Sequence, residues 1–195
     1  VRTFDGRIGR RIAADFAGGF RGYGSGPARR AHYGWRVPPR LDGRAVLVTG
    51  ASSGIGRATA VLAAEEGATI AAVDVDEAGL AATVDTIRGT GGRISARAAD
   101  VAERQDLIAA IDALAVEVGS FHGVFANAAI LPPPAPVGEV DWQEWARVID
   151  VNLTGAVLTL VAALPHAVDG GSLLVNGSSM AIRPRSGRLA YVAAK

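Results

Sequence analysis

The sequence predicts an α/β protein built around a doubly wound parallel sheet, and three observations lead to that fold class. From residue 44 onward, short apolar runs rich in Val, Ile and Ala alternate with longer segments of helical spacing. The connections between them are short and often contain glycine. The first two runs are mostly apolar and do not alternate with polar residues, as in strands whose two faces are both covered by helices. Parallel strands also need crossover connections, which the helices supply.

The elements follow one another as repeated strand and helix units. The first strand, "RAVLVTG", ends in a glycine, and glycines also close the first three helices. A proline loop, "LPPPAPVG", separates the fourth strand from a long helix. We expect strands over residues 44–50, 68–76, 93–101, 121–129 and 171–179. We expect helices over residues 54–67, 77–92, 104–119 and 142–164, with a further helix beginning near Tyr191.

Charge divides the 195 residues into two parts, which we take as residues 1–40 and residues 41–195. The first part has nine arginines and two acidic residues, whereas the second has 11 basic and 17 acidic residues. A basic Arg/Gly-rich extension can bind nucleic acid or another anion, but a solvated tail has the same composition. We expect the tail, in which only residues 9–20 could form a short amphipathic helix, followed by an extended linker at 37–40.

Composition excludes several kinds of site. The chain has no cysteine, so it has no disulfide and no thiolate metal site, and its three histidines show no metal-ligand spacing. We therefore expect no metal. No apolar run approaches the roughly 18 residues of a membrane span. The N-terminus also lacks a signal peptide's apolar core. These observations predict a cytoplasmic protein that binds neither membrane nor nucleic acid.

A glycine-rich turn, "TGASSGIG" at 49–56, lies between the first strand and the first helix. Such a turn allows a pyrophosphate to approach the backbone, and the helix N-terminus offers free N–H groups to it. Asp74 follows Gly56 by 18 residues, where a dinucleotide site would bind the adenosine ribose. Asp74, and Ser53 in place of a basic residue, favour NAD over NADP. The alternative for Asp74 is a solvated acid at a strand end.

Tyr191 and Lys195 are four residues apart, and Lys195 is the only lysine in the chain. On a helix, residues i and i+4 share one face, so the phenol and the ammonium would be neighbours. A nearby ammonium favours phenolate over phenol, which would suit the tyrosine to exchange a proton with an alcohol. A compact three-donor ammonium also differs from a planar guanidinium, which gives a reason for a lysine at this position.

Several motifs together resemble the short-chain dehydrogenase/reductase family. The glycine turn is followed, 135 residues after Gly56, by Tyr-x-x-x-Lys. Between them lie "ADV" at 99–101, "ANAA" at 126–129 with Ala129 in place of the usual glycine, "VNLTG" at 151–155 and "NGSS" at 176–179. The resemblance covers residues 41–195. It implies a Rossmann-type domain and an NAD(P)-dependent oxidoreductase that transfers a hydride between a nicotinamide cofactor and a secondary alcohol or ketone.

The resemblance also implies the site residues. The serine would hold the substrate oxygen, Tyr191 would act as general acid/base, and Asn152 would hold a water that links the lysine to solvent. The expected catalytic residues are Asn152, Ser179, Tyr191 and Lys195. The expected cofactor-binding residues are Gly50, Ser52, Ser53, Gly54, Ile55, Gly56, Asp74, Asp100, Val101, Asn127, Tyr191 and Lys195.

The catalytic serine is open between two positions. Ser178 has the family's usual spacing of 13 residues before the tyrosine, whereas Ser179 is the second serine of the Ser-Ser pair. We expect Ser179 to be the catalytic serine. The end of a strand fixes the direction of the side chains there, whereas the loop between serine and tyrosine can differ by one residue in length.

Family members usually continue well beyond this lysine, so we expect an incomplete chain whose C-terminal strands are missing. We expect a homo-oligomer only for a full-length form. The alternative function is a fragment that binds a dinucleotide without turnover. A third hypothesis, anion or nucleic-acid binding by the basic extension, predicts steeply salt-dependent binding.

Overall fold

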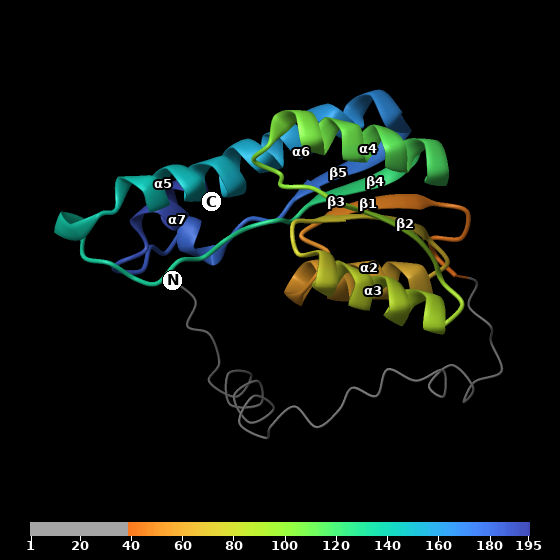
Figure 1. The fold of residues 1–195 in the computed structure, drawn as a ribbon, viewed down its shortest axis with the longest axis horizontal. Helices are drawn as coiled ribbons and strands as arrows, with labels where there is room; N and C mark the ends of the chain where they lie inside the picture. The colour runs from red at the N-terminus through yellow and green to blue at the C-terminus, as the bar shows by residue number, and fades with distance from the viewer. Residues whose placement is uncertain (1–38) are drawn as a thin grey trace, which may run out of the picture. The chain divides into compact units, whose positions relative to one another are not determined.

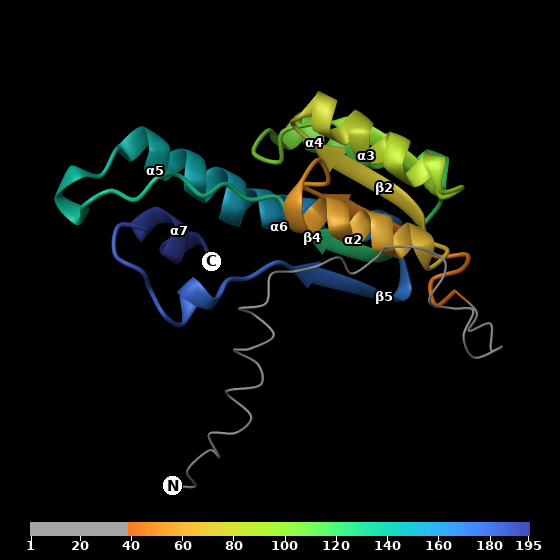
Figure 2. The same cartoon turned by 90° about the horizontal axis from the view of Figure 1, so that it is seen from below.

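The computed structural model describes residues 39–195, which form a sheet covered by helices on both faces (Figures 1 and 2). Residues 1–38 lie outside the described residues, and they include the candidate helix over 9–20 and the first half of the expected linker. The described part opens with a turn at residues 40–43, and its first strand begins at Ala45.

The predicted parallel sheet is confirmed. Its strand order is β3-β2-β1-β4-β5, and every pair of neighbours is parallel. The chain runs outward from β1 to β3 and then crosses back to the other side of β1, so the strand order reverses between β1 and β4. The strands are β1 (Ala45–Thr49), β2 (Thr69–Asp74), β3 (Arg93–Ala98), β4 (Phe121–Ala126) and β5 (Ala167–Val175).

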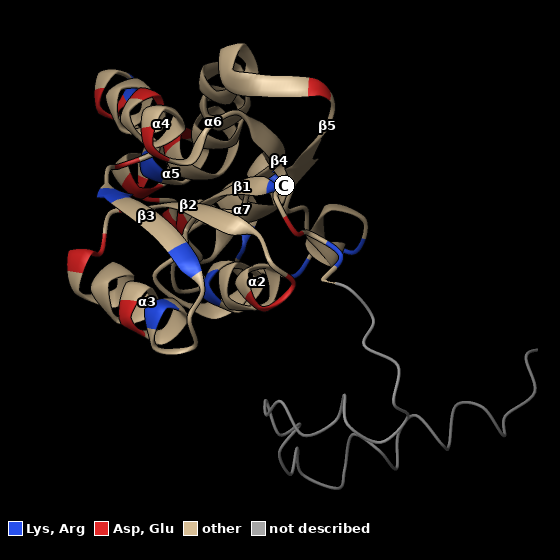
Figure 3. Ribbon diagram, turned by 90° about the vertical axis from the view of Figure 1, so that its right-hand side faces the viewer, with Lys and Arg blue, Asp and Glu red and all other residues tan. Residues whose placement is uncertain are grey.

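Helices lie on both faces of the sheet, as Figure 3 shows end-on. Two helices cover one face, α2 (Gly54–Glu65) and α3 (Glu77–Gly89), and two cover the other, α4 (Arg104–Val118) and α6 (Gly155–Ala163). Beyond the carboxyl ends of the strands lie α5 (Trp142–Ile149) and α7 (Leu189–Ala194), which contact each other. Asp76 begins α3 and Asp141 begins α5, each accepting hydrogen bonds from first-turn N–H groups.

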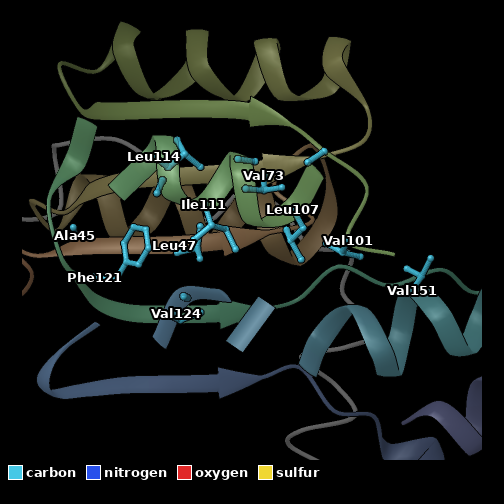
Figure 4. Close-up of a cluster of buried hydrophobic side chains, with 14 residues drawn as sticks. Ala45, Leu47, Val73, Val101, Leu107, Ile111, Leu114, Phe121, Val124 and Val151 are labelled. Carbon is cyan, nitrogen blue, oxygen red and sulfur yellow. The ribbon is translucent and has the colours of Figure 1, made fainter. Parts of the chain in front are cut away.

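The core has two layers because successive strand side chains point to opposite faces. Leu47 and Val73 point towards α4. They belong to a cluster with Ile111 and Leu114 of that helix and Phe121 of β4 (Figure 4). The next residue on β1, Val48, belongs to a second cluster, together with Ile70, Ala72, Leu80 and Ile87. Both faces of the central strands are therefore buried, which explains why they read as continuous apolar runs.

The long helix expected over 142–164 is confirmed as a continuous helical run, Trp142–His166, but this run is not α-helical throughout. Between α5 and α6 the chain forms a π-helical segment, Asp150–Thr154. At the centre of this wider turn, the side chain of Asn152 is buried and bonds the backbone of Ile130 on both sides: Oδ1 accepts from its N–H at 2.7 Å, and Nδ2 donates to its carbonyl at 2.9 Å. Such insertions into α-helices frequently occur at functional sites.

The helical run Trp142–His166 also corrects the expectation that no segment could span a membrane. On length and composition it could, with a mean hydropathy of 1.8 in its most apolar window. A core helix passes the same test, and here Val148, Val151, Thr159 and Ala163 are buried in the protein. We therefore infer no membrane role from the run.

The last strand starts and ends four residues earlier than expected. We predicted 171–179, but β5 covers Ala167–Val175, with an irregular register between Phe121 and Gly123 of β4. The carboxyl end of the strand is thus Val175, and the two serines follow it in a loop and a single 3₁₀ turn, Ser179–Ala181. The argument that a strand end directs the catalytic serine does not hold in this structure.

We expect Gly155→Ala to destabilise the protein. A Cβ at this position would lie 2.7 Å from Cγ2 of Val101 and 3.2 Å from its backbone oxygen. Valine has little rotamer freedom, so the backbone must shift, at a cost of about 1–3 kcal/mol. Urea unfolding measures the difference.

Gly89→Ala is the matched control, because nothing lies within 4 Å of its added Cβ at the end of α3. Equal unfolding free energies for the two variants would contradict the predicted steric conflict.

Candidate active site

A cavity of about 500 Å³ opens at the carboxyl ends of the strands, where the strand order reverses between β1 and β4. This is the place where open α/β sheets bind their ligands. The volume is within the range of small-molecule and cofactor sites. Its lining comprises Gly50, Ser52, Ser53, Gly54, Ile55, Asp74, Val75, Ala99, Asp100, Val101, Asn127, Ala128, Ala129, Ile130, Leu131, Arg147, Val151, Asn176 and Tyr191.

The glycine loop is shaped for a ligand that approaches its backbone. Gly50 and Gly54 have φ values of 70° and 51°, which favour glycine. A Cβ on Gly56 would lie 1.9 Å from the carbonyl oxygen of Gly50, so no larger residue fits there. Ser53 begins α2 without bonding the helix through its side chain, and the first turn holds no acidic residue. The N-terminus of α2 can therefore hold an anionic group such as a pyrophosphate.

Asp74 lies at the end of β2 with its carboxylate fixed on both sides. Oδ2 accepts a hydrogen bond from the N–H of Ser52 at 2.8 Å, and Oδ1 accepts from the N–H of Asp76 at 3.0 Å. Carboxylate oxygens have further lone pairs, so Asp74 can still accept hydrogen bonds from ligand hydroxyls. The glycine loop, the helix N-terminus and this carboxylate together fit a dinucleotide.

The turn after β3 supplies the next part of the lining. Asp100 accepts a hydrogen bond from the N–H of Ala102 at 2.9 Å, which tightens the turn. Val101 is buried against Gly155 at the beginning of α6 and also lines the cavity. Both residues line the cavity, and their expected role in binding the cofactor stays a prediction.

Asn127 and Asn176 connect the glycine loop with Lys195. Asn127 donates through Nδ2 to the carbonyl oxygens of Thr49 and Gly50, at 3.1 and 3.3 Å. Its Oδ1 accepts from Nδ2 of Asn176 at 2.9 Å, and the carbonyl oxygen of Asn176 accepts from Nζ of Lys195 at 2.8 Å. The ends of β1, β4 and β5 are thereby joined to the end of α7.

Tyr191 and Lys195 share one helical turn, as the sequence predicted. The N–H of Lys195 donates to the carbonyl oxygen of Tyr191 at 3.1 Å, and Nζ lies 6.0 Å from the centre of the tyrosine ring. Tyr191 lines the cavity, whereas Lys195 does not line it and bonds Asn176, which does. Burial of the Lys195 ammonium lowers its pKa from the ordinary value of 10.5.

The other two expected catalytic residues lie outside the cavity lining. Asn152 is buried beneath the loop after β4, where it binds Ile130. Ser178 caps the 3₁₀ turn, accepting a hydrogen bond from the N–H of Met180 at 3.1 Å, and Ser179 begins that turn in an exposed position. The roles of all four residues stay predictions.

Comparison with known proteins gives the family. The profile of the short chain dehydrogenases matches residues 44–195, nearly all of the described chain. The chain belongs to this family. A cyclohexanol dehydrogenase from an Acinetobacter species is 35% identical to it over 161 residues, which cover 80% of this chain and 63% of the relative. A cis-4-hydroxycyclohexanecarboxylate dehydrogenase from Sinomonas cyclohexanicum is 42% identical over 138 residues, 70% of this chain and 55% of the relative.

Solved structures agree with this short-chain dehydrogenase family assignment. An NAD⁺-bound xylitol dehydrogenase superposes with a TM-score of 0.77 at 29% identity, covering 80% of this chain and 61% of the neighbour. A carveol dehydrogenase from Mycobacterium avium in complex with NAD gives 0.76 at 29% identity, with the same coverage. The chain thus spans less than two thirds of the length of these relatives.

In this member of the short-chain dehydrogenase family, several cavity residues escaped the sequence reasoning. Asn176 belongs to the "NGSS" motif, but only the serines of that motif were predicted to have a role. Arg147 precedes Val151 by one helical turn, a spacing that the sequence does show. Ile130 and Leu131 follow the "ANAA" motif and carried no signal of their own. Conversely, Gly56, Asn152, Ser179 and Lys195 were expected in the site and do not line the cavity.

The lowered pKa of Lys195 predicts a pH-dependent stability. A group with a depressed folded-state pKa adds stability above its unfolded value and loses it as pH falls through the folded value. The unfolding free energy of the wild type should therefore increase relative to Lys195→Met as pH rises towards 10.5. Urea unfolding of both proteins at pH 7.5 and pH 10 measures this change, and groups common to both proteins cancel. A difference that is constant, or that decreases towards pH 10, would contradict the buried ammonium.

Proposed function

We propose that the chain is the cofactor-binding and proton-transferring part of an oxidoreductase that transfers a hydride between NAD and a secondary alcohol or ketone. The observation that carries this proposal is one continuous cavity with the glycine loop and Asp74 in one part of its lining and Tyr191 in another. A dinucleotide bound along this cavity would put its phosphates at the N-terminus of α2 and its reactive ring near the phenol.

NAD is the preferred cofactor in this proposal. The carboxylate of Asp74 is held by two backbone N–H groups, so it cannot turn away easily from an adenosine ribose. It would accept hydrogen bonds from the ribose hydroxyls and repel the additional phosphate of NADP. Ser53 offers no positive charge to that phosphate. Two solved neighbours, the xylitol and carveol dehydrogenases, are complexes with NAD, which supports the same choice.

The proton would move through Tyr191. The nicotinamide, when bound, supplies the hydride chemistry. In the direction of alcohol oxidation, the Tyr191 oxygen accepts the hydroxyl proton as the carbonyl forms, and in reduction it returns that proton. Lys195 would hold the nicotinamide ribose. Ser179 would hold the substrate oxygen, and Asn152 would fix a water on the path to solvent.

The relatives support a secondary alcohol as the substrate class. Those reported above are named for cyclohexanol and for cis-4-hydroxycyclohexanecarboxylate, and a D-threitol dehydrogenase from Mycolicibacterium smegmatis is 39% identical over 143 residues. Each of the three named compounds carries a secondary hydroxyl group, in two of them on a six-membered ring, and threitol carries primary hydroxyl groups as well. The cytoplasmic location and an oligomer of a longer form stay predictions.

A second candidate is a domain that binds the dinucleotide without turnover. The observation that favours it is the position of the expected catalytic residues: of the four, Tyr191 alone lines the cavity, and Ser179 is exposed on a 3₁₀ turn. Binding of NAD without oxidation of any of the relatives' alcohols would support this candidate over the first.

We expect Tyr191→Phe to abolish oxidation of cyclohexanol or a related secondary alcohol while NAD binding changes less than threefold. The variant removes only the hydroxyl, so it keeps the ring that lines the cavity. Loss of a general acid/base group lowers the rate by about 10²–10⁴. Absorbance of NADH at 340 nm follows turnover, and calorimetric titration follows binding.

Tyr23→Phe and Tyr33→Phe serve as controls, since these tyrosines belong to the extension. Turnover by Tyr191→Phe at the wild-type rate would exclude Tyr191 as the proton-transfer group.

The two serines can be separated by alanine substitution. We expect Ser179→Ala to lower turnover, because its hydroxyl would hold the substrate oxygen. Ser178→Ala should mainly loosen the 3₁₀ turn, since Oγ of Ser178 accepts from Met180. The kcat of each variant with saturating NAD decides between them: if Ser178→Ala alone abolishes turnover, Ser178 is the catalytic serine.

A further inference from the structure

We propose that Thr83 and Arg57 are positioning residues for the adenosine-ribose site, because they hold the peptide group that fixes the Asp74 carboxylate. The inference rests on the proposed NAD binding and concerns residues that do not line the cavity. Thr83 lies in α3 and is fully buried, and Arg57 lies in the first turn of α2.

One peptide group is bound at both ends. The carbonyl oxygen of Ala51 accepts a hydrogen bond from Oγ1 of Thr83 at 3.0 Å. The N–H of Ser52 belongs to the same planar unit and donates to Oδ2 of Asp74 at 2.8 Å. Because the unit is rigid, the hydroxyl that holds its carbonyl also sets the direction of its N–H. Thr83 therefore acts on the carboxylate without touching it.

Arg57 orients the hydroxyl. Its Nε donates to Oγ1 of Thr83 at 2.9 Å, so the hydroxyl oxygen accepts from Arg57 and its proton is left for a carbonyl. Two carbonyls lie 3.0 Å from Oγ1, those of Ala51 and Gly79. The carbonyl of Gly79 also accepts from a second Arg57 nitrogen at 3.2 Å. That competing donor favours Ala51 as the acceptor of the hydroxyl proton.

The result is a chain of aligned hydrogen bonds from a cation to an anion. It runs from the Arg57 guanidinium through the Thr83 hydroxyl and the peptide group after Ala51 to the Asp74 carboxylate. Hydrogen bonds in such a chain polarise one another, and the low dielectric of a buried site strengthens them. Thr83 is wholly buried and Ser52 is 6% exposed, so water competes little with the two central bonds.

Packing fixes the same contact from the other side. A Cβ on Gly79 would lie 2.9 Å from Cβ of Ser52 and 2.4 Å from Oδ2 of Asp76. The glycine thus lets the first turn of α3 approach the glycine loop closely. The N–H of Gly79 also donates to Asp76, whose own N–H holds the second oxygen of Asp74. The hydrogen bonds to both carboxylate oxygens of Asp74 therefore depend on the conformation of the first turn of α3.

The test uses a matched pair of substitutions at Thr83 in the full chain. Thr83→Val keeps the shape and removes the hydroxyl, whereas Thr83→Ser keeps the hydroxyl and removes the methyl group. Calorimetric titration with ADP and with adenosine 2′,5′-bisphosphate measures binding of the adenosine and phosphate part of the cofactor without its nicotinamide half. We expect Thr83→Val to weaken ADP binding about tenfold, which corresponds to about 1.4 kcal/mol. The ratio of ADP affinity to bisphosphate affinity should decrease in Thr83→Val. The ADP affinity of Thr83→Ser should stay within threefold of the wild type.

Arg57→Met provides a second variant at a partly exposed site, in case Thr83→Val does not fold. It removes both donors and keeps a similar stem. We expect it to weaken ADP binding and decrease the same ratio of affinities, with no further loss when it is combined with Thr83→Val. Titration with nicotinamide mononucleotide should give the same affinity in all variants, since this half of the cofactor does not reach the adenosine-ribose site.

The outcomes separate the two proposals. A wild-type chain that binds neither NAD nor ADP would overturn the proposed function and this inference with it. A wild type that binds ADP, with Thr83→Val or Arg57→Met binding it equally well, would overturn the positioning role alone. Equal losses for ADP and nicotinamide mononucleotide would also overturn it, because they would indicate a general loosening of the fold.

Discussion

The buried amide of Asn127 is the interaction on which the arrangement of the site depends. It holds the carbonyls of Thr49 and Gly50 through one atom and Asn176 through the other, so it fixes the ends of β1, β4 and β5 relative to one another. A Cβ on Gly50 or Gly56 would come within 3 Å of its Nδ2, which means that the glycine loop is packed onto this amide. Parallel strands alone would not fix the distance from the glycine loop to Lys195. The Asn127 amide fixes this distance, because it binds the side chain of Asn176, whose carbonyl oxygen accepts a hydrogen bond from the Lys195 ammonium.

Much of the fold could be predicted from the sequence because the central strands are buried on both faces. A strand between two helical layers has no polar side, so β1 and β2 read as unbroken apolar runs, and glycines end the helices beside them. The edge strand β5 has one neighbouring strand, and Leu173, Leu174 and Val175 are 43–53% exposed. Its pattern therefore constrains its register weakly, and the predicted bounds were four residues late.

The π-helical segment within the long helix shows a second limit of prediction from the sequence. Its sequence has helical spacing throughout, and nothing in the spacing indicates where a wider turn begins. The π-helical segment is coupled to contacts far away in the chain: Asn152 binds both backbone groups of Ile130, and Gly155 packs against Val101. An asparagine within a helix is visible in the sequence, but its partner 22 residues earlier is not. The motif "VNLTG" therefore identified a special position without giving its shape.

The residues of the site also fall into those that the sequence predicts and those that it does not. Residues whose conformation is required locally, such as the glycines of the loop, could be predicted, because a positive φ or the absence of a Cβ is a property of one position. Residues that act through a partner could not. Thr83 is an ordinary helix residue in the sequence, and its hydroxyl acquires a function only because α3 packs 32 positions away against Ala51. Arg57 follows directly after the last loop glycine, where a cation could equally have faced a phosphate. Its guanidinium turns instead towards Thr83 and Gly79, so its charge acts on the cavity through the backbone. A dinucleotide site of this kind is thus specified by two sets of residues, and motif reasoning reaches only the set that faces the ligand.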